Sequence, residues 1–148
     1  MIPYREFWSL SRPPFDAGPD PDFFFESRAH GEALARLLYF ASDRSMGLAA
    51  VTGEIGAGKT TTLRVLAGRL APDVFRTLTI FTAPESPAGV LAEINRLLGG
   101  AEAEEPATSV DALRREFRRL VDRHIAAFDR HLLVVIDEAQ LMSEACLD

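Results

Sequence analysis

The chain has 148 residues, of which 47% are hydrophobic and 26% charged, and its formal net charge is −6 with a pI of about 5.1. This length suits one domain or most of one, and the acidic balance argues against a general nucleic-acid coat protein while leaving room for a local basic patch. Cys146 is the only cysteine, which excludes a disulfide within the chain and agrees with a reducing compartment.

Residues 1–26 form a lead segment rich in proline and aromatic residues. Prolines at this density exclude a regular helix, and the aromatic residues are too many for a disordered tail. We expect an irregular segment packed on the domain, either as a lid over an edge of the core or as a wall of a nucleotide-base pocket. The residues concerned are Phe7, Trp8, Pro13, Pro14, Phe15, Pro19, Pro21, Phe23, Phe24 and Phe25.

Residues 27–70 are predicted to form a helix, a strand and a second helix. Ser27 can cap a helix that extends to about residue 44, because small and large apolar residues recur there at three- and four-residue spacing. The run "GLAAVT" at 47–52 is short, apolar and closed by Gly53, which predicts a buried strand. The next segment predicts a helix over 59–70 that stops before a proline.

The second half predicts two further strands and the helices between them. Residues 76–82 are β-branched and aromatic, as in a strand, and 86–98 read as a helix with a serine cap and proline at its first position. A long helix is expected over 108–129, its apolar face formed by Val110, Leu113, Phe117, Leu120, Val121, His124 and Phe128. A third strand follows over 132–136, and Ser143 begins another helix. This alternation indicates an α/β fold with a parallel sheet.

The segment "GEIGAGKT" matches the phosphate-loop pattern, with an apolar strand expected before it and a helix after it. Glycines let the backbone adopt positive φ, so that successive N–H groups and the helix N-terminus face an anion. Lys59 is the only lysine in the chain, and its compact ammonium suits a narrow site for β- and γ-phosphates better than the planar fork of arginine. The alternative is a glycine-rich turn without a ligand. The predicted nucleotide-binding residues are Gly53, Glu54, Ile55, Gly56, Ala57, Gly58, Lys59, Thr60 and Thr61.

Asp137 and Glu138 come directly after the third apolar strand. Ligands of open α/β sheets lie at the carboxyl ends of strands, so we expect this pair near the phosphate loop. Asp137 would hold Mg²⁺ together with the hydroxyl of Thr60, and Glu138 would polarise the water that attacks the γ-phosphate. Lys59 and Glu138 are therefore the predicted catalytic residues. The alternative is that both acids only cap the next helix.

Taken together, the two motifs resemble the Walker A and Walker B motifs of AAA+ ATPases. The segments "FWSLSRPPFDAGPDPDFFFESRAHGEALARLLYF", "GLAAVTGEIGAGKTTTLRVL" and "VVIDEAQLMS" are similar to general secretion pathway protein A (ExeA-like) ATPases. The resemblance implies that residues 27–148 are a P-loop NTPase core, a three-layer α/β/α fold with strand order 5-1-4-3-2. It also implies that the fourth strand, the sensor, the arginine finger and the lid would follow residue 148, so we expect a chain truncated after Walker B. For the adenine pocket it suggests Phe25, His30 and Leu34, although His30 could instead be a structural residue at the start of its helix.

The same resemblance implies an oligomeric ATPase that uses ATP with Mg²⁺. It also implies a secretion-system or inner-membrane partner reached through a later region. Without a signal peptide or a run of about 18 apolar residues, we expect the chain to be cytoplasmic, while a longer relative could be anchored to the inner membrane.

Two alternative functions stay open. One is an ATP-dependent DNA-binding regulator of transposition, which five arginines between residues 114 and 123 could serve by binding DNA phosphates. These arginines could equally form a solvated face with ion pairs four residues apart. The other alternative is a nucleotide-binding chain without turnover.

Overall fold

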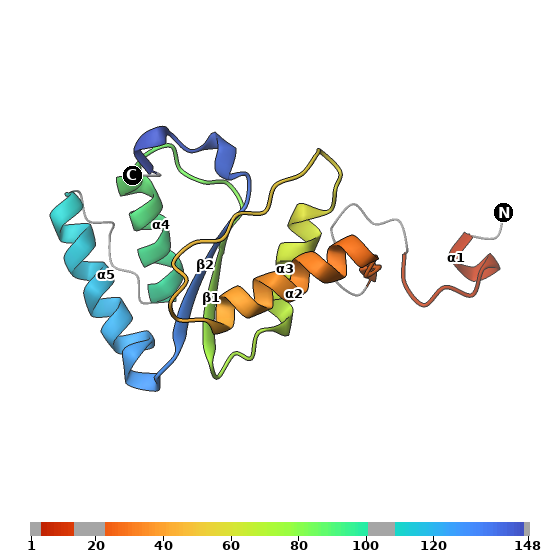
Figure 1. The fold of residues 1–148 in the computed structure, drawn as a ribbon, viewed down its shortest axis with the longest axis horizontal. Coiled ribbons are helices and arrows are strands. Elements are labelled where there is room, and N and C mark those ends of the chain that lie inside the picture. The colour runs from red at the N-terminus through yellow and green to blue at the C-terminus, as the bar shows by residue number, and fades with distance from the viewer. Residues whose placement is uncertain (1–3, 14–22, 101–108, 147–148) are drawn as a thin grey trace. The chain divides into compact units, whose positions relative to one another are not determined.

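The computed structural model describes residues 4–13, 23–100 and 109–146 (Figure 1). The chain divides into two compact units, Met1–Arg69 and Leu70–Asp148, and each is described by itself. In the described ranges, no helix is both long enough and apolar enough to cross a membrane.

The first unit contains the helices α1 (Tyr4–Phe7), α2 (Arg28–Ser42) and α3 (Lys59–Arg69). As predicted, α2 begins after Ser27, whose hydroxyl oxygen accepts a hydrogen bond from the backbone N–H of His30 at 3.3 Å. Helices α2 and α3 contact each other, and they supply the buried residues of this unit. These residues are Leu34, Leu37, Thr62, Val65 and Leu66.

The described part of the lead segment differs from the expectation. Tyr4–Phe7 form one helical turn, which is feasible because no proline interrupts these four residues. Most of the described aromatic side chains of this segment are exposed, Phe25 at 82%, and its packing on the domain stays a prediction. Phe24 is half-buried, with its ring centroid 5.6 Å from that of His30. Pro14, Phe15, Pro19 and Pro21 lie outside the described residues.

The strand predicted over residues 47–52 is not formed in the structure. The segment has no regular secondary structure, and Leu48, expected to be buried, is 87% exposed. A strand needs a neighbour to pair its backbone N–H and C=O groups, and the described residues offer this segment no pairing partner. The apolar composition that predicted the strand is therefore present without the pairing that would bury it.

The second unit is built on the strands β1 (Phe75–Ile80) and β2 (His131–Ile136), which pair in parallel from Phe75 with His131 to Ile80 with Ile136. Both strands were predicted to within a few residues, and the parallel α/β layout is confirmed. The resemblance implies the strand order 5-1-4-3-2, in which the second and third strands are neighbours. In that numbering β1 is the second strand and β2 the third, so their pairing agrees with the implied order. The structure describes two strands, so the complete three-layer fold stays a prediction.

Helices α4 (Pro87–Gly99) and α5 (Val110–His124) lie between β1 and β2 in the chain and pack against each other. The cap at Ser86 is confirmed: its hydroxyl oxygen accepts a hydrogen bond from Gly89 N at 3.1 Å. Helix α5 is shorter than the predicted 108–129.

The N-cap of α5 is Ser109, which accepts from Ala112 N at 3.2 Å, whereas Thr108 lies outside the described residues. The helix ends because the chain turns through the 3₁₀ segment η3 (Ala126–Phe128) to Asp129, whose φ of 50° is left-handed. Of the predicted apolar face, Leu113 and Leu120 are buried, while Val110 and Phe128 are exposed.

The core of the second unit forms where these elements meet. It consists of Leu78 from β1, Leu98 from α4, Leu120 from α5 and Ile125 just beyond α5. Asn95 of α4 is 3% exposed, and its side-chain amide donates a hydrogen bond of 2.9 Å to the carbonyl oxygen of Leu113 on α5. Helix α4 also contacts β1, so the helix pair supports the sheet whose carboxyl end carries the acidic pair.

After β2 the chain continues through two 3₁₀ segments, η4 (Ala139–Leu141) and η5 (Glu144–Cys146). The second lies where Ser143 was expected to open a helix.

Candidate functional site

The phosphate-loop motif lies in the first unit, between the extended residues 47–52 and helix α3. Gly56 and Gly58 have φ angles of 79° and 78°, the left-handed region that glycine enters without steric cost. Gly53 does not share this conformation, since positive φ among the described glycines occurs at Gly56, Gly58 and Gly100. A Cβ atom on Gly53 would meet only ordinary contacts, the nearer at 3.5 Å from Ala57 Cβ. The backbone of the loop therefore turns most tightly in its second half, at Gly56 and Gly58.

Lys59 is the first residue of α3, as the motif requires. Its Nζ atom donates hydrogen bonds to the carbonyl oxygens of Gly53 at 3.0 Å and Glu54 at 2.9 Å. An ammonium has three donors, and these two bonds go to neutral carbonyls rather than to an acid. Among the described residues, no carboxylate forms an ion pair with Lys59. The loop thus holds a positive charge at its centre with no negative partner from the described chain.

The other predicted loop residues occupy the turn and the first turn of the helix. Ile55 is fully exposed at the tip of the loop, and Ala57 N donates a hydrogen bond to the carbonyl oxygen of Glu54 at 3.2 Å. Thr60 and Thr61 are half-buried on the first turn of α3. This is the position from which a hydroxyl could reach a metal ion or a phosphate at the helix N-terminus.

The three residues suggested for an adenine pocket differ in their surroundings. Leu34 is 1% exposed and belongs to the buried residues of the first unit, whereas Phe25 is largely exposed. His30 contacts the phosphate loop itself, because its Nε2 atom lies 3.0 Å from the carbonyl oxygen of Ala57. Sequence reasoning missed this contact, which joins residues 27 positions apart.

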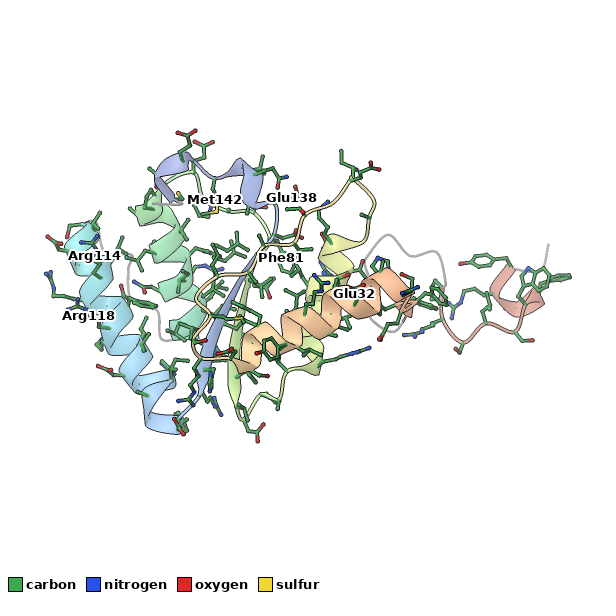
Figure 2. The ribbon with its side chains drawn as sticks, viewed as in Figure 1. Glu32, Phe81, Arg114, Arg118, Glu138 and Met142 are labelled. Atoms are coloured by element: carbon green, nitrogen blue, oxygen red, sulfur yellow. The ribbon has the colours of Figure 1, made fainter. Side chains whose placement is uncertain are left out.

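The acidic pair lies in the second unit, directly after β2. Asp137 N donates to the carbonyl oxygen of Ile80 at 2.9 Å, and Asp137 Oδ1 accepts from Glu138 N at 3.0 Å. Glu138 has a left-handed backbone, with φ of 52° and ψ of 36°, and its carboxylate accepts a hydrogen bond from the side-chain amide of Gln140. Figure 2 shows Glu138 where the chain leaves β2.

The alternative interpretation, in which the acids only cap the next helix, does not hold for Glu138. Glu138 precedes η4, but its side chain makes no capping hydrogen bond there. A non-glycine residue in the left-handed region costs free energy, and such positions cluster at functional sites. The phosphate loop and the acidic pair belong to different units, so their proximity stays a prediction.

Helix α5 presents the predicted arginines to solvent. Arg114, Arg115, Arg118, Arg119 and Arg123 are all exposed. Figure 2 shows Arg114 and Arg118 on the side of α5 that faces away from α4. Within the described part of the chain, the first four of these arginines form no ion pair, so the expected pairs four residues apart are absent for them.

A family model described as an AAA domain matches residues 42–148, a range that includes the phosphate loop and the acidic pair. The chain belongs to the AAA domain family. It is also 33% identical over 147 residues to general secretion pathway protein A of Aeromonas hydrophila, which confirms the resemblance deduced from the sequence. This match covers 98% of the chain but 26% of the relative, so the chain spans about a quarter of that protein's length. No solved structure matches the chain.

Proposed function

We propose that the chain binds ATP with Mg²⁺ and hydrolyses it to ADP and phosphate, as an ATPase similar to general secretion pathway protein A. The observation that carries the proposal is the position of Lys59. Its ammonium is held inside a glycine loop at the start of a helix and has no carboxylate partner among the described residues. A phosphate group is the ligand that a positive charge, helix-end N–H groups and a tight glycine turn would bind together.

The loop residues would divide the binding of ATP among them. The backbone N–H groups of residues 54–61 would surround the phosphates, with Lys59 balancing the charge of the β- and γ-phosphates. Thr61 would donate its hydroxyl toward the α-phosphate. Binding would require Lys59 to exchange one or both of its bonds to Gly53 and Glu54 for bonds to phosphate oxygens.

Mg²⁺ would be held by the Thr60 hydroxyl and the Asp137 carboxylate, together with phosphate oxygens. The described residues contain no group of three or more His, Cys, Asp and Glu side chains that could hold a metal. Such a sparse donor set fits Mg²⁺, which proteins commonly bind through one or two carboxylates plus substrate phosphates. When bound, Mg²⁺ neutralises charge on the phosphates; Glu138 would accept a proton from the attacking water.

Two variants separate binding from turnover. Lys59→Ala should abolish the rise in melting temperature that Mg-ATP gives to the unchanged chain. Glu138→Gln should keep that rise but release no phosphate. If neither the unchanged chain nor Glu138→Gln releases phosphate while both are stabilised by Mg-ATP, the chain is a nucleotide-binding protein without turnover. If Mg-ATP stabilises none of them, the proposal is wrong.

The similarity to general secretion pathway protein A supports a wider proposal. On that basis the chain would adopt the three-layer α/β/α fold, assemble as a homo-oligomer and serve a secretion system or an inner-membrane partner. Light scattering with and without Mg-ATP would test the assembly, since a monomer under both conditions would contradict it.

A DNA-dependent ATPase is the second candidate, and the exposed arginines of α5 favour it. Four of them lack an ion pair among the described residues, so their charge is available to phosphates. In this case duplex DNA would stimulate phosphate release, and the stimulation would fall steeply with salt concentration. The net charge of −6 opposes this candidate, so we prefer the first.

A further inference from the structure

His30 joins the start of helix α2 to the phosphate loop. Its Nδ1 atom lies 3.0 Å from the hydroxyl oxygen of Ser27, and its Nε2 atom lies 3.0 Å from the carbonyl oxygen of Ala57. The ring is half-buried and packs at a tilt of 50° against Phe24. All of these residues belong to the first unit, so the contact lies within one compact body.

The two hydrogen bonds determine where the proton of the neutral ring lies. A carbonyl oxygen can only accept, so Nε2 carries the hydrogen and donates it to Ala57. The other nitrogen then accepts, and the Ser27 hydroxyl donates to it. The oxygen of that hydroxyl also accepts from the backbone N–H of His30 at 3.3 Å. Ser27, His30 and Ala57 therefore form one continuous chain of donors and acceptors.

The ring also occupies the space beside the loop. A Cβ atom on Gly58 would lie 2.9 Å from His30 Nε2, closer than side-chain carbons normally approach. Two features therefore favour glycine at position 58. Its φ of 78° strains residues that carry a side chain, and the neighbouring imidazole leaves no room for a Cβ atom. A loop that moved toward α2 would collide with the ring, so the contact restrains the loop from one side.

The hydrogen bond to Ala57 also fixes the direction of the next N–H group. In a planar trans peptide the C=O and N–H bonds point in opposite directions. Because the carbonyl of Ala57 points to His30, the N–H of Gly58 in the same peptide points away from His30. This N–H belongs to the group of loop amides that the proposed function assigns to the phosphates.

We propose that His30 is a positioning residue that holds the Ala57–Gly58 peptide of the phosphate loop in its anion-binding orientation. The inference rests on the proposed function, because it assigns His30 to the loop that binds ATP. It differs from a hydrogen bond to adenine, since both ring nitrogens already have protein partners. It also differs from a purely structural role at the start of α2, which would need only the bond to Ser27.

A matched pair of variants distinguishes these roles. In His30→Gln the amide nitrogen lies about where Nε2 was and can still donate to Ala57. In His30→Asn the shorter side chain reaches about the position of Nδ1, so it keeps the Ser27 partner and loses Ala57. We expect His30→Asn to weaken Mg-ATP binding roughly five- to tenfold, the effect of losing one hydrogen bond, and His30→Gln to stay close to the unchanged chain. Calorimetric titration measures both, and thermal unfolding without nucleotide checks that both are folded.

Several outcomes would overturn the inference. If both variants bind Mg-ATP as tightly as the unchanged chain, or if both lose affinity equally, the bond to Ala57 does not position the loop. Lys59→Ala serves as the control for the proposed function. If Lys59→Ala loses binding while His30→Asn does not, this inference fails and the proposed function survives.

Two measurements without nucleotide test the inference even if the chain does not bind ATP. Amide hydrogen exchange in residues 54–60 should be faster in His30→Asn than in His30→Gln, and equal rates would contradict the restraint. Nitrogen NMR of the unchanged chain should show the Nε2–H tautomer for His30. An Nδ1–H tautomer would contradict the bond to Ala57, whether or not any variant folds.

Discussion

The side-chain amide of Gln140 donates a hydrogen bond to the carboxylate of Glu138 on the turn that follows β2. The backbone of Glu138 is left-handed, and its side chain forms no helix cap. The carboxylate proposed to accept a proton from water is therefore oriented by a neighbour on its own turn. This relationship separates two properties of the site that can be changed independently, namely the carboxylate itself and the group that orients it.

Replacing Gln140 by alanine should lower turnover and leave ATP affinity unchanged. The carboxylate of Glu138 would lose its donor and rotate more freely, so fewer bound ATP molecules would find it in position. We expect a smaller loss than in Glu138→Gln, which removes the base. Steady-state phosphate release gives kcat, and nucleotide titration gives the dissociation constant. A Gln140→Ala variant with unchanged kcat would show that the hydrogen bond does not orient a catalytic group.

Replacing Glu138 by glycine should abolish turnover without destabilising the fold. A left-handed backbone costs a non-glycine residue about 1–2 kcal/mol, which glycine avoids at some entropic cost in the unfolded chain. The unfolding free energy should therefore stay the same or rise by up to about 1 kcal/mol. Urea unfolding measures it, with Glu138→Ala as the control that keeps the left-handed penalty. A Glu138→Gly variant less stable than Glu138→Ala would contradict this account.

Replacing Lys59 by arginine should remove ATP binding almost as completely as alanine does. The ammonium lies 3.0 Å and 2.9 Å from the carbonyl oxygens of Gly53 and Glu54, a space that suits a compact donor rather than a planar fork. Thermal unfolding with and without Mg-ATP measures the effect. Arg69→Lys, the reciprocal change at the other end of α3, is the control and should keep ATP stabilisation. An arginine variant that binds normally would mean that charge alone is required.

Replacing Asn95 by alanine should destabilise the second unit by about 0.5–1.5 kcal/mol, the net contribution of one hydrogen bond. The change would remove the side-chain amide that donates an interhelical hydrogen bond to the carbonyl oxygen of Leu113 at the contact between α4 and α5. Urea unfolding followed by circular dichroism measures the loss. Arg114→Ala, at an exposed position of α5, should change stability by less than about 0.5 kcal/mol. Equal effects of the two changes would show that the Asn95 bond contributes nothing specific.

Local chemistry made much of the fold predictable. Ser27 and Ser86 begin their helices as predicted, because a serine cap satisfies an N–H group only three residues away. The apolar run before Asp137 predicted β2 correctly. The apolar run around Leu48 gave the same signal without a strand, since a strand also depends on a pairing partner that no local pattern contains.

The part of the candidate site that lies within the phosphate-loop motif could be predicted from the sequence, and the contact outside the motif could not. The glycines and Lys59 predicted a loop at the start of α3, and the structure has it. The contact of His30 with Ala57 joins helix α2 to the phosphate loop, and nothing in the spacing of these residues indicates it. The pattern of serine followed three residues later by histidine at the start of α2 was the one signal available, and it indicates only the bond to Ser27.

The parallel pairing of β1 with β2 has a consequence for the order of folding. Phe75 pairs with His131, and both α4 and α5 lie between them in the chain, so pairing requires closing a long loop. We expect α4 and α5 to pack first and the strands to pair afterwards. Pulsed hydrogen exchange during refolding would then protect helix amides before strand amides, and simultaneous protection would contradict this order. In that sequence of events, Asp137 and Glu138 reach their final positions only when the last strand joins, so the chemistry of the site would appear at the end of folding.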